Sequence, residues 1–127
     1  MPQIDRPQLA LTALRAAAAT LALSLACSAA SAMTLREMRA LEKASKQGEN
    51  YANYYLVGLM EGALEAHNQA VRAGAKPHIC LNGRRLEPHM ARSLFDTELQ
   101  RNAGVYEVDM PAQLVMANAL AAVYACG

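Results

Sequence analysis

The pattern of hydrophobic and polar positions after residue 33 predicts a first short helix. Thr34 and Glu37 have the spacing of a capping box, in which the threonine hydroxyl and the glutamate carboxylate bind each other's backbone amides. Apolar residues then recur at three-residue steps along one helical face: Leu35, Met38, Leu41 and Ala44. Gly48 is expected to end this helix.

A second and longer helix is predicted from Tyr51 to about Ala73, and Gly74 is expected to end it. Its apolar and small residues form one stripe at helical spacing: Tyr51, Tyr55, Gly58, Leu59, Gly62, Ala66 and Ala70. Each glycine costs up to about 1 kcal/mol of helix propensity. We therefore expect a compensating gain at Gly58 and Gly62, namely the close backbone approach of a neighbouring helix.

A third helix is predicted after the segment 74–88, which is rich in turn signals. Pro88 suits the first turn of this helix, where the missing amide of proline costs nothing. The sequence Asn102–Gly104 is expected to end it. Its buried face is expected to comprise the apolar residues Met90, Ala91, Leu94 and Phe95.

A fourth helix is predicted close to the end of the chain. Asp109 is a natural N-cap for it, with Pro111 in its first turn. Its apolar residues are Leu114, Val115, Ala117, Leu120, Ala121 and Tyr124. Residues 105–108 alternate like a strand, but the run is short and isolated, and we expect a loop there. The predicted fold class is therefore all-α, a small helical bundle of about four helices.

The first 32 residues have the composition of a secretory signal peptide. Arg6 and Arg15 precede or flank an apolar run of 11 residues (16–26), and the small triplet Ala30-Ser31-Ala32 supplies a cleavage site. The run is shorter than the roughly 20 residues that span a bilayer, so a membrane anchor is the weaker interpretation. A lipoprotein signal at Cys27 would need leucine where Ser24 stands. We expect cleavage after Ala32 and a mature domain of residues 33–127.

Charge and cysteine content follow from this cleavage. The chain has 12 Lys+Arg and 11 Asp+Glu, and the mature part keeps 10 of each. A neutral domain has no electrostatic footprint for nucleic acid or for an anionic membrane, and we expect neither as a partner. Loss of Cys27 leaves Cys80 and Cys126, which are expected to form a disulfide in an oxidising compartment. The alternative is two free thiols.

The residues that could carry chemistry do not form a known catalytic or metal motif. His67, His78 and His89 are each 11 residues apart, which is not a ligand spacing, so we expect solvated histidines and no metal. Glu61 and Glu65 lie one turn apart near His67 and could act as acid and base if buried, but surface carboxylates are far commoner. No phosphate-binding loop or nucleophile motif is present in the sequence. An enzyme is not expected, nor is a cofactor.

Two groups of residues are candidates for protein binding. Arg84 and Arg85 follow the Asn82-Gly83 turn on the Cys80 loop, and they form either a solvated turn or an anchor for a partner's carboxylate. Three tyrosines cluster within little more than one turn: Tyr51, Tyr54 and Tyr55. At most two of them can face one core, so the third is expected at an edge or an interface.

The combination of these features resembles a known family. Tyr55, Gly58 and Gly62 form the motif Y-x-x-G-x-x-x-G, Cys80 lies in the following loop, and an Ala/Leu-rich helix (114–124) ends just before Cys126. Over about residues 34–127 this resembles the Tai family, the type VI secretion amidase immunity proteins of Gram-negative bacteria.

The resemblance implies an all-helical periplasmic protein whose Cys80 and Cys126 match the structural disulfide and whose Tyr55, Gly58 and Gly62 match the packing helix. Such proteins are not enzymes. They bind an effector protein, a peptidoglycan amidase, and occlude its active site with a loop or helix end, and members work as dimers, so a homodimer is also implied. We expect the partner-facing surface to include Asn82, Gly83, Arg84 and Arg85. The alternative is a small periplasmic stress chaperone that binds unfolded clients.

Overall fold

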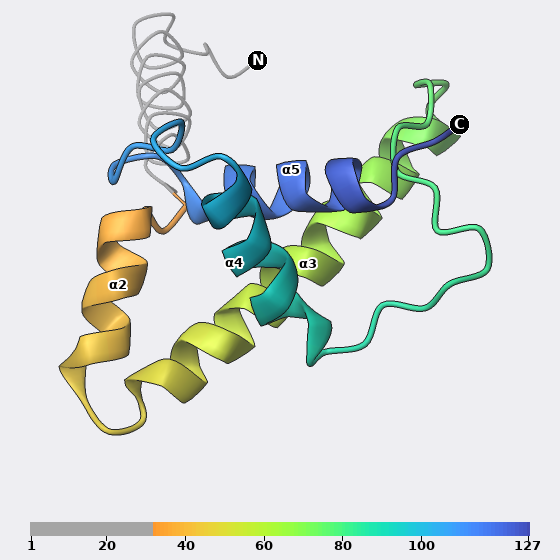
Figure 1. Ribbon diagram of the computed structural model, residues 1–127. Coiled ribbons are helices and arrows are strands. Elements are labelled where there is room, and N and C mark those ends of the chain that lie inside the picture. Colours follow the sequence, from red (N-terminus) through yellow and green to blue (C-terminus); the bar gives the residue numbers. More distant parts are fainter. Residues whose placement is uncertain (1–31) are drawn as a thin grey trace, which may run out of the picture. The chain divides into compact units, whose positions relative to one another are not determined.

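Residues 32–127 are described by the computed structural model, and they form four α-helices (Figure 1). The helices are α2 (Leu35–Ala44), α3 (Gly48–Arg72), α4 (Met90–Arg101) and α5 (Ala112–Val123). A disulfide joins Cys80 to Cys126. The predicted all-α bundle with one disulfide is therefore confirmed. The predicted signal peptide and its Cys27 lie outside the described residues, apart from Ala32 at the expected cleavage site. In the described part, no helix is both long enough and apolar enough to cross a membrane.

The first turn of α2 is held by the predicted capping box. The backbone amide of Glu37 donates to the Thr34 hydroxyl oxygen at 3.2 Å, and the amide of Thr34 donates to the Glu37 carboxylate at 2.7 Å. These bonds satisfy amides that have no partner within the helix. Of the four residues on the predicted apolar face, Leu35 and Met38 are buried and Leu41 is partly buried, whereas Ala44 is exposed.

Gly48 was expected to end α2, but it is the first residue of α3. Its position allows the two helices to meet closely. A Cβ at Gly48 would lie 2.7 Å from the carbonyl oxygen of Glu42 and closer still to that of Leu41. Only a hydrogen fits between these backbone atoms, so glycine is required where α3 starts against the last turn of α2.

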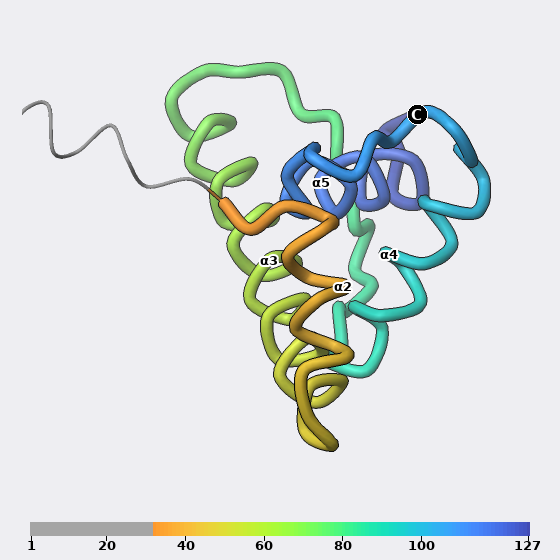
Figure 2. The backbone as a smooth tube through the Cα atoms, turned by 90° about the vertical axis from the view of Figure 1, so that its left-hand side faces the viewer, coloured from red at the N-terminus to blue at the C-terminus, as the bar shows by residue number. Residues whose placement is uncertain are grey.

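The central helix is α3, which contacts each of the other three helices. Figure 1 shows α2 and α3 diverging from the loop that joins them and α5 crossing α3, and Figure 2 gives the view turned by 90°. The buried face of α3 is not the predicted stripe of tyrosine and small residues. It comprises instead Gly48, Ala52, Leu56, Met60 and His67. Of the predicted stripe, Tyr51, Gly58, Gly62, Ala66 and Ala70 are exposed, whereas Tyr55 and Leu59 are partly buried against the core.

The core lies between these helices and is closed by α5. The largest fully buried side chains come from all four helices: Phe95, Leu35, Leu56, Met60, Met116, Leu120 and Val115. Burying each such side chain contributes roughly 1.5–3 kcal/mol to folding. Helix α5 carries no charged residue, and it packs against both α3 and α4.

Both ends of α5 are tied to distant segments by isolated β-bridges. At its start Thr34 pairs with Pro111, and the amide of Ala112 donates to the carbonyl of Met33 at 2.9 Å. At its end Ile79 pairs with Ala125. These bridges hold the chain before α2, the loop before α4 and the two ends of α5 in one framework.

Asp109 is not the N-cap of α5, contrary to prediction. The helix begins three residues later, with Pro111 as the extended residue before it. The first amide of α5 binds the backbone of Met33, so it needs no side-chain cap. Asp109 instead accepts a hydrogen bond from Arg36 Nε at 2.9 Å, and this ion pair links the start of α2 to the loop before α5.

The predicted limits of α4 agree with the structure within two residues. Pro88 lies in the turn that leads into the helix, since its carbonyl accepts from the amide of Ala91 at 3.2 Å. The helix ends at Arg101, with Asn102 as its C-cap. Residues 105–108 form a loop, as predicted.

Candidate functional site

The loop that contains Cys80 is fixed to the end of α5 by a covalent bond and by backbone contacts. The Cα atoms of Cys80 and Cys126 are 5.0 Å apart, and the Cys80 amide donates to the carbonyl of Tyr124 at 2.7 Å. One residue earlier, Ile79 forms its bridge with Ala125. The loop therefore leaves the helical body from a rigid point.

The chain turns sharply directly after this point. Asn82 and Gly83 both have positive φ angles, 51° and 79°. Asparagine and glycine are the residues that adopt this left-handed conformation most readily. The turn is closed by a hydrogen bond from the Arg84 amide to the carbonyl of Leu81 at 3.0 Å. Asn82 and Gly83 thus form the turn that the sequence predicts.

The side chain of Arg84 stabilises the loop from within. Its Nε donates to the carbonyl of Leu81 at 2.9 Å, and its Nη2 donates to the carbonyl of Cys80 at 3.3 Å. The guanidinium carbon also lies 4.6 Å from the centroid of the Tyr124 ring, which is a cation–π distance. Arg84 is therefore a brace for the turn as well as a charge on its surface.

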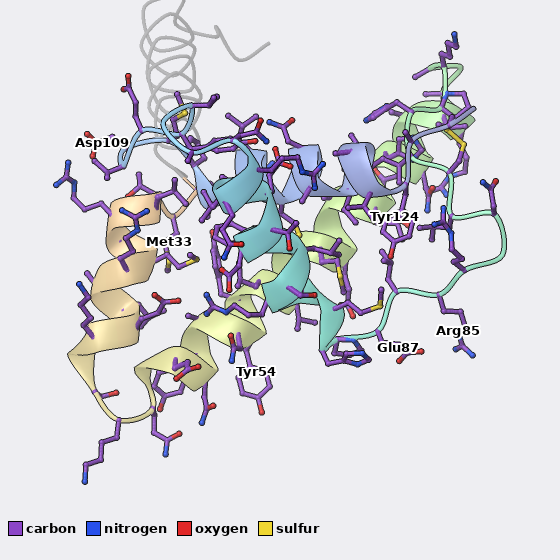
Figure 3. All side chains as sticks on the ribbon, in the orientation of Figure 1. Met33, Tyr54, Arg85, Glu87, Asp109 and Tyr124 are labelled. Carbon is purple, nitrogen blue, oxygen red and sulfur yellow. A yellow bond between two sulfur atoms is a disulfide. The ribbon has the colours of Figure 1, made fainter. Side chains whose placement is uncertain are left out.

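The neighbouring arginine is placed differently. Arg85 is exposed and points away from the helices, whereas Tyr124 lies at the inner side of the loop (Figure 3). The four predicted partner-binding residues thus lie on one exposed turn. Among the described residues, the guanidinium of Arg85 on this turn has no ion-pair partner.

The histidines were expected to be solvated, but His67 of α3 is buried, with 7% of its surface exposed. Its Nε2 accepts hydrogen bonds from the backbone amides of His78 at 3.1 Å and Ile79 at 3.2 Å. The ring of His78 stands edge-on to it, with centroids 4.6 Å apart. Sequence reasoning missed this contact because the amides that donate to His67 lie 11 and 12 residues further along the chain.

The other titratable residues considered from the sequence lie apart from one another. His78 and His89 are exposed, and the described residues hold no cluster of three His, Cys, Asp or Glu side chains arranged like metal ligands. Glu61 and Glu65 are exposed on α3. Glu65 accepts from Arg72 at 2.7 Å, and this hydrogen bond holds the pKa of the Glu65 carboxyl below its usual value of 4.5. The structure therefore does not bring these carboxylates together with His67.

Gly58 and Gly62 do not support a close helix approach within the chain. A Cβ built at either position would meet no atom within 4 Å among its surroundings. The expected packing of a neighbouring helix against these glycines is thus not found in the described part, because the buried face of α3 lies elsewhere on the helix. Tyr55 does pack against the core, as expected.

A hollow between the first half of α3 and the start of α4 is a second surface feature, which sequence reasoning did not find. It has a volume of about 480 Å³, and its lining residues are Asn50, Asn53, Tyr54, Val57, Pro88, His89 and Arg92. Tyr54 is 77% exposed beside it, and Figure 3 shows its ring projecting from α3 into solvent. Tyr51 is exposed as well, so two of the three tyrosines lie at the surface, where the sequence led us to expect one.

Arg92 is held at the base of this hollow by polar contacts. Its Nε donates to the side-chain oxygen of Asn53 at 2.8 Å, and its Nη2 lies 2.8 Å from Glu42 Oε1. Asp96 lies 3.6 Å away, one turn further along α4. Arg92 thus joins α2, α3 and α4, and its charge is largely balanced by its neighbours.

A buried polar group lies at the opposite end of α4. Glu98 is buried, and its Oε1 accepts from the Tyr106 hydroxyl at 2.7 Å and from Asn102 Nδ2 at 2.8 Å. Asn118 of α5 donates in turn to the Tyr106 oxygen at 2.9 Å. Burial and the bond to Glu98 raise the pKa of Tyr106 above its usual value of 10.0. These contacts fix the loop before α5 and do not open onto a described cavity.

The sequence matches no protein-family model, and comparisons with curated proteins and with solved structures find no match either.

Proposed function

We propose that the protein is a periplasmic immunity protein, which binds a type VI secretion peptidoglycan amidase and inhibits it by inserting the turn Asn82–Arg85 into its active-site cleft. The single observation that carries this proposal is the construction of the turn. It is exposed and cationic, yet it is held by the Cys80–Cys126 disulfide and by the Arg84 side chain.

Rigidity of this kind favours tight binding. Ordering a flexible side chain on binding costs about 0.5–1.5 kcal/mol, and a loop that is already fixed avoids much of that loss. Arg84 is ordered before any partner arrives, since it contacts both Leu81 and Tyr124. The exposed guanidinium of Arg85 is then free to form a bidentate pair of hydrogen bonds with a carboxylate of the partner.

The identity of the partner and the compartment rest on the sequence resemblance. The amidase immunity family is helical, exported and disulfide-bonded, and the helical fold and the disulfide of this chain are consistent with it. Under this proposal the protein has no catalytic activity of its own and needs no cofactor. The same resemblance implies a homodimer, which light scattering on the purified protein tests.

The direct test is inhibition of cell-wall cleavage. The protein is mixed with a type VI secretion peptidoglycan amidase, for which this proposal points to the neighbouring gene, and soluble fragments released from purified peptidoglycan are measured. We expect cleavage to fall to background at equimolar protein, and R85A to require a clear excess. Undiminished cleavage in the presence of excess protein would reject the proposal.

Exposed apolar side chains favour a second candidate function, a stress chaperone. Tyr54 and Val57 border the hollow described above, and Tyr51, Val105 and Leu114 are exposed elsewhere. Such groups can bind unfolded clients. The test is suppression of client aggregation after a drop to about pH 2–3, where carboxylates are protonated. Suppression by the wild type but not by Y54S would support this candidate.

A further inference from the structure

The hydrogen bonds of His67 define the form of its ring. A backbone amide can only donate, and two of them, from His78 and Ile79, point at the same nitrogen Nε2. That nitrogen must therefore carry a lone pair and no proton. The single proton of the neutral ring then lies on Nδ1, which is buried with no hydrogen-bond partner in the structure. His67 is thus a neutral imidazole with a fixed tautomer.

This contact sets the position of the chain just before the partner-binding turn. Ile79 is bound on one side by His67 and on the other by its bridge to Ala125, and Cys80 follows directly. Between the end of α3 and Ile79 the residues 72–78 are all exposed. His67 is therefore the point at which α3 holds this otherwise solvated connection.

We propose that neutral His67 is a positioning residue for the turn Asn82–Arg85, and that its protonation releases the segment His78–Ile79 and weakens partner binding. The second half of this inference rests on the proposed function. Protonation would place an N–H on Nε2 opposite two amide N–H groups, so both hydrogen bonds would be lost. It would also bury a charge whose two N–H groups have no acceptor, which is costly in a protein interior.

The charged groups around His67 offer no compensation for that charge. On α3, Glu65 and Arg72 are exposed and pair with each other at 2.7 Å. The connecting segment contributes Lys76 and the edge-on ring of His78, both of which are cationic when protonated. The last turn of α5 carries no charged side chain. In the described residues no carboxylate contacts the imidazole, so acidification is expected to open the contact.

The test uses two variants of His67 and two control histidines. His67→Gln keeps a side-chain oxygen that can accept from the amides and does not titrate, whereas His67→Phe keeps the bulk but removes the acceptor. His89→Gln changes an exposed histidine outside this contact, and His78→Gln removes the neighbouring ring. Hydrogen exchange at the His78 and Ile79 amides is measured at about pH 7.5 and about pH 5.5, corrected for intrinsic rates, with amidase binding measured in parallel.

On acidification we expect the wild type and His89→Gln to lose protection at these amides, and to lose affinity for the amidase with it. His67→Gln should keep both at the lower pH, His78→Gln should behave like the wild type, and His67→Phe should lack protection at both. Wild-type protection that does not change with pH, or a His67→Gln protein that is as acid-sensitive as the wild type, would overturn the inference. Acid-dependent protection without any binding of the amidase would uphold the positioning role and reject the proposed function.

Discussion

The guanidinium carbon of Arg84 lies 4.6 Å from the centroid of the Tyr124 ring, so an arginine that looks like a free surface cation is part of its own loop. Its Nε and Nη2 bind the carbonyls of Leu81 and Cys80 on the same loop. The adjacent Arg85 is exposed and has no such role. Two identical residues next to each other therefore have separable effects.

Arg84→Ala is expected to lower the stability of the protein and the affinity for its partner, whereas Arg85→Ala should lower the affinity alone. Loss of the stacking and of the two hydrogen bonds of Arg84 corresponds to about 1–2 kcal/mol of unfolding free energy. Urea unfolding and titration calorimetry measure the two effects. Equal unfolding midpoints for both variants would contradict the bracing role of Arg84.

Removal of the disulfide is expected to destabilise the fold without changing its helix content at low temperature. The bond closes a loop between positions that are 46 residues apart, and the chain-entropy model gives roughly 4 kcal/mol for a loop of that length. The double variant Cys80→Ser, Cys126→Ser should therefore unfold at much lower urea concentration. A reducing agent should have the same effect on the wild type and none on the variant.

Gly48→Ala is expected to destabilise the protein, although alanine normally favours a helix. The added methyl group would collide with the carbonyls of Leu41 and Glu42, and such overpacking costs about 1–3 kcal/mol. Gly58→Ala and Gly62→Ala are matched controls, because a Cβ there meets open space. Each should instead raise the unfolding free energy by up to about 1 kcal/mol. Thermal unfolding of the three variants separates these outcomes.

The ion pair between Arg36 and Asp109 predicts a pH-dependent contribution at the acidic end. The hydrogen bond from Arg36, followed by its charge, holds the pKa of Asp109 below its usual value of 3.8. Because the folded pKa is lowered, the stabilising effect is present above pH 3.8 and is lost as the pH falls through the lower folded value. An NMR titration should show the Asp109 carboxyl returning toward 3.8 in Arg36→Ala. Arg39→Ala, on the same helix, should leave it unchanged.

Tyr106→Phe is expected to destabilise the loop before α5. The change removes one of the two hydrogen-bond donors to Glu98 Oε1, and a hydrogen bond to a charged group contributes about 1.5–3 kcal/mol. Tyr54→Phe is the control, since its ring is exposed and should shift stability by no more than about 0.5 kcal/mol. Because the pKa of Tyr106 is raised in the fold, wild-type stability should fall as the pH rises above 10.0, and less so in Tyr106→Phe.

The features that sequence reasoning predicts correctly are those that depend on residues close together in the chain. The capping box of Thr34 and Glu37, the Asn82-Gly83 turn and the end of α4 at Asn102 are of this kind. The pairing of Cys80 with Cys126 follows from counting the cysteines outside the predicted signal peptide. None of these requires knowledge of which helix faces which.

The features that it predicts wrongly depend on contacts between distant segments. On α3, a stripe with Tyr51 and Gly58 competes with one that contains Leu56 and His67, and the first contains fewer obviously polar residues. Tyrosine tolerates exposure because its hydroxyl binds water, whereas a histidine can be buried when it is hydrogen-bonded. The amides that bind His67 belong to residues 78 and 79, so the periodicity of α3 alone cannot identify its buried face.

The β-bridges at the two ends of α5 have a consequence for the order in which the protein can fold. Thr34 pairs with Pro111 and Ile79 with Ala125. The first described residues and the loop before α4 therefore make these contacts only when residues 111–125 are present. A nascent polypeptide cannot close this core while its C-terminal stretch is still being synthesised. The order of folding is therefore set by the last residues that the structure describes, and not by the capped helix α2 with which they begin.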